Sequence, residues 1–216
     1  MINMNNSKEN ILEFGEVFTS EKEVNKMLNL VSEETFRIDS RFLEPACGDG
    51  NFLIEVLKRK LSVVKEIYHK NQHDFEKYSF IAVANIYGVD IRNENVLKCR
   101  ERLSVCFEKF YLSCYKTKYN PTFVEVIKFV LSKNILYGDA ITLKVPNSSQ
   151  PVVFSEWSLA VGNLVTRTEY ALNNLLESKS ISALPLFSDL GEEQFLPEPL
   201  RKYSAVNYMD LSNELI

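Results

Sequence analysis

Residues 42–53 read Phe-Leu-Glu-Pro-Ala-Cys-Gly-Asp-Gly-Asn-Phe-Leu, and this stretch decides the fold. An apolar strand end runs into an acid, Glu44, and then into a tight turn that contains Gly48 and Gly50, after which a helix pattern opens. Glycines let the backbone turn sharply, and a helix start offers free N–H groups, so a ligand can approach the backbone closely here. A dinucleotide fingerprint would need a third glycine where Leu53 stands, which argues against a nicotinamide cofactor.

Apolar and polar residues alternate along the rest of the chain in helix-like and strand-like patterns. The patterns predict helices over 20–31, 52–68, 93–114 and 123–131, and strands over 41–44, 80–89, 134–137 and 158–161. Polar residues 69–79 are expected to end the second helix. Strands that alternate with helices predict an α/β fold with a parallel, doubly wound sheet and helices on both faces. Ligands of such sheets bind beyond the carboxyl ends of the strands.

The charge distribution gives no sign of a self-sufficient binder of duplex DNA. The chain has 216 residues and a net charge of −4. Residues 171–216 hold seven acids and three bases, while residues 1–170 hold 22 of each. Duplex binders usually show a basic face, whereas the basic residues within 58–60 and 98–102 are best explained as solvated helix faces.

The start of the chain predicts a cytoplasmic protein. The first ten residues are polar and lack the apolar core of a signal peptide, and no stretch is apolar for long enough to span a membrane. The four cysteines, Cys47, Cys99, Cys106 and Cys114, show no paired metal-ligand spacing, so we expect no metal site. Cys99 and Cys106 fall on one helix stripe, where we expect buried thiols.

Acids stand where the predicted strands end. Glu44 could accept a hydrogen bond from an amino group, while the helix start behind it could hold a carboxylate, which together suit the two ends of a free amino acid. Asp90 ends the second strand, where an acid often bonds ribose hydroxyls, and Ile91 would then lie against an adenine ring. Asp139 could accept from an adenine amino group and the Ala140 backbone could donate to the ring. Ordinary turns are the alternative explanation for each acid.

These segments together resemble the adenine-specific (N6) DNA methyltransferases. Residues 42–53 resemble motif I of that family. Residues 14–20, Phe-Gly-Glu-Val-Phe-Thr-Ser, resemble motif X, which precedes motif I in the gamma-type motif order. Residues 88–91 and 137–140 stand at the places of motifs II and III, so the resemblance covers about residues 14–163.

The resemblance implies a Rossmann-like domain that binds S-adenosylmethionine (SAM). It also implies methyl transfer to N6 of adenine in DNA, as in restriction–modification systems, with DNA as the partner. By the resemblance, Phe18 and Thr19 would close over the SAM. The cofactor-binding residues that it implies are Phe18, Thr19, Glu44, Ala46, Gly48, Gly50, Asp90, Ile91, Asp139 and Ala140.

The place of motif IV departs from the family pattern. The family has Asn or Asp, two prolines and an aromatic residue, where the Asn oxygen and first proline carbonyl accept from the adenine amine and the aromatic stacks on the flipped-out base. Here Asn163 matches, and the resemblance makes it the catalytic residue. Leu164 and Val165 replace the prolines, and Thr166 replaces the aromatic.

The chain is also short for the family, which leads to a domain division and a second hypothesis. We expect a polar lead-in over 1–13, the SAM-binding domain over 14–170, and an acidic tail or partial C-terminal half over 171–216. A parallel sheet that is incomplete at its C-terminal end exposes an edge, so a specificity subunit, a C-terminal half or a second copy is an expected partner. The alternative function is an inactive methyltransferase-like interaction subunit that keeps the fold and SAM binding.

Overall fold

The computed structural model describes residues 19–174 and 197–213. A three-stranded parallel sheet in the order β1-β2-β3 forms its centre, with β1 at Phe42–Glu44, β2 at Ile86–Asp90 and β3 at Ile135–Tyr137. Glu44 pairs with Gly88, and Asp90 pairs with Tyr137, so the carboxyl ends of the three strands lie at the same end of the sheet. An α/β fold with a parallel sheet and helices on both sides is confirmed.

Six α-helices lie completely within the described residues. They are α2 (Glu21–Asn29), α3 (Ser32–Thr35), α4 (Asn51–Tyr68), α5 (Gln72–Ala84), α6 (Asn93–Tyr115) and α7 (Pro121–Asn134). Helix α2 begins at Ser20, whose side chain accepts from the Glu23 N–H while the Glu23 carboxylate accepts from the Ser20 N–H. Asn120 caps α7 in a similar way and Pro121 follows at its first turn. A short 3-10 helix, η1 (Lys116–Lys118), follows α6.

Helix α5 was not predicted, and the strand predicted over 80–89 is wrong in its first half. Residues 72–84 form one helix that Asn71 caps, and the strand begins only at Ile86. Most of the apolar side of α5 is buried, including Phe75, Phe80 and Val83. A short apolar run that is buried in the core carries no clear period, so sequence alone does not separate strand from helix there.

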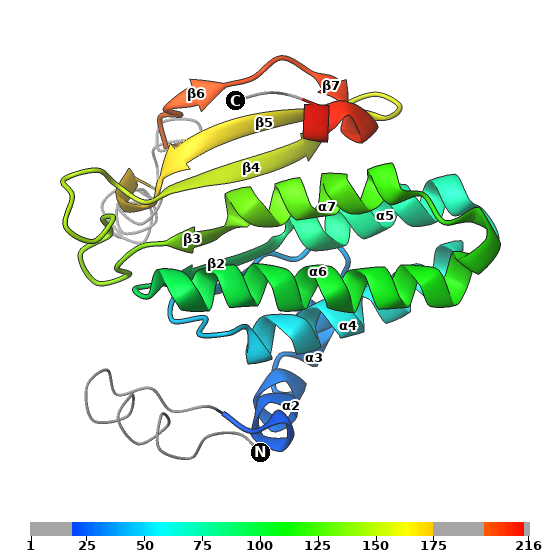
Figure 1. Cartoon of the computed structure of the whole chain (residues 1–216), viewed down its shortest axis with the longest axis horizontal. Coiled ribbons are helices and arrows are strands. Elements are labelled where there is room, and N and C mark those ends of the chain that lie inside the picture. The colour runs from blue at the N-terminus through cyan, green and yellow to red at the C-terminus, as the bar shows by residue number, and fades with distance from the viewer. Residues whose placement is uncertain (1–18, 175–196, 214–216) are drawn as a thin grey trace, which may run out of the picture.

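The two faces of the parallel sheet are covered differently (Figure 1). Alternating β2 residues point to opposite faces, and Ile86 and Gly88 face the core formed with α4 and α6. Tyr87 and Val89 face the other way, where they pack with Val152, Phe154 and Leu172. Figure 1 shows α4 and α6 below the parallel strands and the β4–β5 hairpin above them.

The predicted fourth parallel strand is wrong, because this segment belongs to a separate antiparallel sheet. Strands β4 (Val153–Leu159) and β5 (Leu164–Ala171) form a hairpin, with Trp157 opposite Arg167. Two short strands pair with β5, namely β6 (Arg201–Lys202) and β7 (Val206–Asn207). Gly162 has φ of +72°, and Gly-Asn is a favoured hairpin turn, so the chain reverses at this point. Among the described residues, no strand pairs with the outer edge of β1.

A buried polar joint connects the two sheets. The Asn134 side chain donates to the Ala84 and Ile86 carbonyls and accepts from the Trp157 indole N–H at 2.9 Å. Trp157 also packs edge-on against the Phe80 ring of α5. Tyr208 of the 3-10 helix η4 (Tyr208–Asn213) packs against the Phe80 ring as well. The hairpin and the C-terminal described segment are therefore parts of one core.

Candidate functional site

The glycine turn between β1 and α4 is hydrogen-bonded to β2 at the carboxyl end of the parallel sheet. The Cys47 N–H donates to the Val89 carbonyl, and the Gly50 N–H donates back to the Cys47 carbonyl, both at 2.9 Å. Gly48 and Gly50 have φ of +52° and +95°, a region that side chains disfavour. Gly50 precedes the first residue of α4, so the turn leads directly into a helix start with free N–H groups.

The two glycines face different surroundings. A Cβ on Gly48 would meet no atom within 4 Å, so the turn is open on that side. A Cβ on Gly50 would lie 2.7 Å from the Cys99 sulfur of α6, so only glycine allows this close approach. Cys47 and Cys99 are both buried beneath the turn, and the Cys99 contact and burial raise the pKa of the Cys47 thiol. Both thiols serve as packing groups; the predicted burial is confirmed for Cys99, whereas Cys106 is only half-buried.

Asp90 at the end of β2 fixes the shape of the turn from the neighbouring strand. Its Oδ2 accepts from the Gly48 N–H at 2.9 Å. Its Oδ1 accepts from the Arg92 N–H at 2.9 Å and from the Asn95 amide at 3.2 Å. The carboxylate is largely buried, so these charge-assisted bonds are strong. Asp90 therefore joins the end of β2, the start of α6 and the glycine turn.

Arg102 of α6 holds the other side of the turn. Its guanidinium lies 2.5 Å from the Asp49 carboxylate and donates to the Asp49 carbonyl at 2.7 Å. A second nitrogen donates to the Asn51 side chain at 2.9 Å. The prediction that Arg102 belongs to a solvated helix face is wrong. Only the fold brings α6 beside the turn, so no local pattern in the sequence indicates this contact.

Glu44 lies at the end of β1 beside an apolar cavity of about 220 Å³. Burial raises the pKa of the Glu44 carboxyl, against a lowering by the hydrogen bond from the Ala46 N–H. The cavity lies between α2, β1 and the first turns of α4. Its walls are Met27, Leu28, Val31, Phe42, Leu43, Glu44, Phe52, Leu53 and Val56. The cavity thus combines one carboxyl group with otherwise apolar walls.

Asp139 lies beyond the end of β3 and is engaged in a local turn. Its carboxylate accepts from the Ile141 N–H at 2.8 Å and from the Thr142 hydroxyl at 2.9 Å, and these bonds lower the pKa of Asp139. Ala140 packs against the smaller core cluster. Ile91 directly follows Asp90, the last residue of the neighbouring strand β2, and 55% of its surface is accessible.

Two predicted residues precede α2. Thr19 lies near the glycine turn, because its carbonyl accepts from the Asn51 amide at 3.3 Å. Phe18 lies outside the described residues. The contact from Thr19 brings the start of α2 to the same end of α4 as Gly50, and residues 20–23 form the cap described above.

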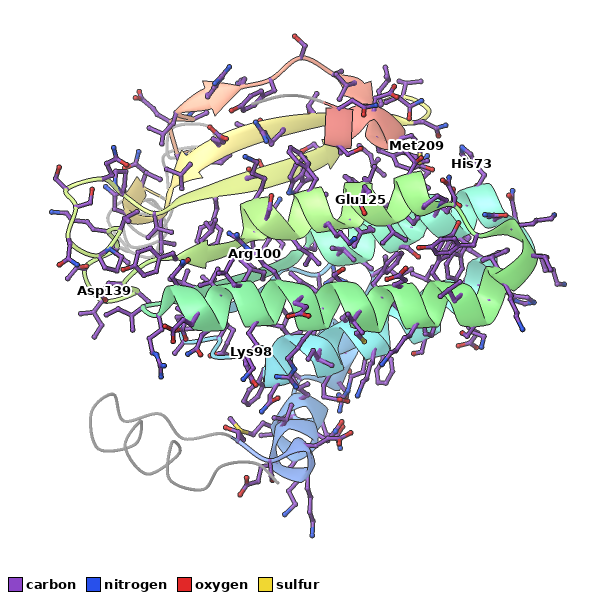
Figure 2. The ribbon with its side chains drawn as sticks, in the orientation of Figure 1. His73, Lys98, Arg100, Glu125, Asp139 and Met209 are labelled. Atoms are coloured by element: carbon purple, nitrogen blue, oxygen red, sulfur yellow. The ribbon has the colours of Figure 1, made fainter. Side chains whose placement is uncertain are left out.

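Asn163 does not lie with the other predicted residues. It sits in the β4–β5 turn, where its amide lies 2.8 Å from His73 Nε2, and its carbonyl accepts from the Tyr208 N–H. Figure 2 shows His73 and Asp139 at opposite ends of the molecule. The site at the strand ends thus brings together Glu44, Gly48, Gly50 and Asp90, with Ala46, Ile91 and Thr19 nearby, but not Asn163.

Comparison with known proteins gives one partial match. A protein of Methanocaldococcus jannaschii that is named for type II restriction enzyme and methyltransferase activities is 43% identical to this chain over 54 residues. The matched stretch is 24% of this chain and 5% of that protein, so the chain spans a small part of its length. No family model matches the chain, and no solved structure matches it. Among the described residues, no helix is both long and apolar enough to cross a membrane.

Proposed function

We propose that this chain is the SAM-binding module of a DNA methyltransferase of the restriction–modification type, directed at N6 of adenine. One observation carries the proposal: the glycine turn lies at the ends of parallel strands, with Glu44 beside it, Asp90 bonded to it and Gly48 facing open space. The partial match to a protein named for methyltransferase activity supports the same family.

The residues around the turn fit the chemistry of SAM. The open side of Gly48 leaves room for close approach of a ligand to the backbone. The N–H groups of the first turn of α4 suit the cofactor carboxylate, and the half-buried Glu44 suits its amino group. The apolar walls of the adjoining cavity suit the methionine chain.

Each residue then has one task. SAM, when bound, supplies a methyl group on a positively charged sulfur. Glu44 orients the amino end, and the turn holds the carboxylate end. Asp90 Oδ2 accepts one backbone N–H in the structure, so it retains a lone pair for a ribose hydroxyl. Ile91 offers an exposed apolar surface to the adenine ring. Asp139 and the Ala140 backbone would hold the adenine edge, which requires the Asp139 turn to rearrange.

The position of Asn163 favours a second candidate function. By resemblance Asn163 would orient the target amine, yet its side chain contacts His73 at the other end of the molecule. The second candidate is a subunit that keeps SAM binding and receives the base-orienting residues from another polypeptide. DNA and a specificity subunit, a C-terminal half or a second copy are its proposed partners.

Calorimetry with SAM tests the cofactor site. We expect measurable binding by the chain, about tenfold or more weaker in Asp90→Ala and Glu44→Gln, because each loses a direct polar contact. Asp210→Ala is the matched control, since this exposed acid lies on η4, outside the site. Circular dichroism and thermal unfolding confirm that each variant is folded. A folded parent chain that does not bind SAM would refute the proposal.

A transfer assay separates the two candidates. The chain is incubated with DNA and SAM labelled in the methyl group, with and without Asn163→Ala. The second candidate predicts SAM binding without label transfer by the chain alone. Transfer that Asn163→Ala abolishes would instead establish the complete enzyme and require the hairpin to move to the site.

A further inference from the structure

Arg167 in the middle of β5 is a buried cation with unsatisfied donors. Its side chain is 6% exposed. No acceptor lies within hydrogen-bond distance of its Nε and Nη1 atoms in the described part of the chain. Its Nη2 lies 3.7 Å from the Glu169 carboxylate, which is longer than a hydrogen bond. A buried guanidinium normally has five donors satisfied by acceptors, so this one lacks the partners that its burial demands.

Aromatic rings surround this guanidinium but cannot replace the missing acceptors. The Arg167 Cζ atom lies 3.7 Å from the Tyr203 ring centroid, 5.7 Å from that of Phe129 and 5.9 Å from that of Trp157. Cation–π contacts of this kind stabilise the charge by about 0.5–2 kcal/mol each. They act on the faces of the rings and leave the in-plane N–H groups of Arg167 without acceptors.

Further cations border the same place. The Lys133 ammonium lies 5.4 Å from the centroid of the Phe129 ring, with which Arg167 also makes a cation–π contact. Arg201 of β6 lies 4.4 Å from the Tyr203 centroid. Burial and the charge of Arg167 lower the pKa of Lys133, against a raising effect of Glu169. Glu169 contributes one negative charge to this group, and one charge does not balance three cations.

We propose that Arg167, Lys133 and Arg201 form a binding site for a phosphate group. A phosphate oxygen accepts in the plane of a guanidinium, which satisfies the donors that the rings leave free. Lys133 and Arg201 add charge at the border, where Arg201 is exposed and Tyr203 is partly exposed. The source is either free phosphate or the backbone of a nucleic-acid strand.

An anion reaches the buried Arg167 nitrogens in this proposal only if the β6 side of the sheet moves. Strand β6 has two residues, which pair with Thr168 and Glu169 of β5, and the Leu200 and Tyr203 N–H groups that flank it donate to the Glu169 and Arg167 carbonyls. Tyr203 follows β6 and covers the Arg167 guanidinium. Displacement of Tyr203 would open the unsatisfied nitrogens to an anion, and the β4–β5 pairing does not depend on it. The site is independent of methyl transfer, so either proposal can fail alone.

Nuclear magnetic resonance of arginine Nε–H groups observes this site directly. The whole chain is labelled with ¹⁵N and titrated with inorganic phosphate, and separately with a short DNA duplex, at constant ionic strength. We expect the Arg167 Nε–H signal, assigned by its loss in Arg167→Lys, to shift on binding. A shift with both ligands identifies a strand phosphate, and a shift with free phosphate alone identifies a small anion. No shift with either would overturn the proposal.

Variants test which cations take part. We expect phosphate to bind about tenfold more weakly in Arg167→Lys, which keeps the charge but loses the planar fork. Lys133→Gln and Arg201→Gln should each weaken binding about threefold or more, and they keep the buried Arg167. Lys128→Gln on the same helix is the matched control, because Lys128 pairs with Glu125. Equal weakening by Lys128→Gln and Lys133→Gln would show general charge attraction and refute a site.

Discussion

Gly50→Ala should be much more damaging than Gly48→Ala, although both glycines have positive φ. At either position alanine costs about 1–2 kcal/mol because the left-handed backbone disfavours a Cβ. At Gly50 the new Cβ also lies 2.7 Å from the Cys99 sulfur, and such overpacking costs about 1–3 kcal/mol more. We therefore expect a loss of about 2–5 kcal/mol in the free energy of unfolding for Gly50→Ala, against about 1–2 for Gly48→Ala.

A double-mutant cycle with Cys99→Ala isolates the contact. Removal of the sulfur leaves the Cys99 Cβ 3.5 Å from the added Cβ of Gly50→Ala, an ordinary contact distance. The double variant should thus be more stable than the sum of the single effects predicts, by about 1–3 kcal/mol. Urea unfolding, followed by circular dichroism, measures all four proteins. Additive effects within 0.5 kcal/mol would refute the proposed steric origin.

Three further predictions concern groups around the sheet. Burial lowers the pKa of Lys60 from 10.5 to about 7. Between pH 7 and 10.5 the unfolded chain therefore binds more protons than the folded chain, so the free energy of unfolding should rise with pH in this range, by up to about 5 kcal/mol. Urea unfolding from pH 6 to 10 should show this rise in the parent and in Lys22→Met, but not in Lys60→Met. Arg102→Gln should weaken SAM binding severalfold in calorimetry, because the turn loses its contact from α6; unchanged affinity would contradict that role. Trp157→Phe should cost about 1–3 kcal/mol in thermal unfolding, since it leaves the buried Asn134 oxygen without a donor, and a neutral effect would contradict the joint.

The sequence predicted the elements whose signals are local. The turn at Gly48 and Gly50, the cap at Ser20 and the long periodic helix α6 each depend on residues a few positions apart. Helix α5 was missed because it is buried in the core and its apolar run resembles a strand. Element type therefore followed from pattern where an element faces both core and solvent, and failed where the core surrounds it.

The sequence predicts which candidate residues follow the strands, but not the bonds between them. Glu44 and Asp90 were expected at strand ends, and the parallel register places them there. The bond from the Gly48 N–H to Asp90 spans 42 positions, and the contact of Arg102 depends on how α6 packs. The Gly-Asn pair at 162–163 is a hairpin signal, but the apolar pattern of residues 158–161 predicts a strand of the parallel sheet that ends there.

The joint made by Asn134 and Trp157 bears on how this protein can be divided. A fragment that ended before β4 would expose the rings of Phe80 and Phe129 and leave the Asn134 oxygen in contact with water. We therefore expect the parallel sheet to be unstable without the hairpin, even though the predicted cofactor residues in the described part, apart from Thr19, belong to the sheet or its loops. Dissection of the gene for expression should retain the hairpin through residue 213.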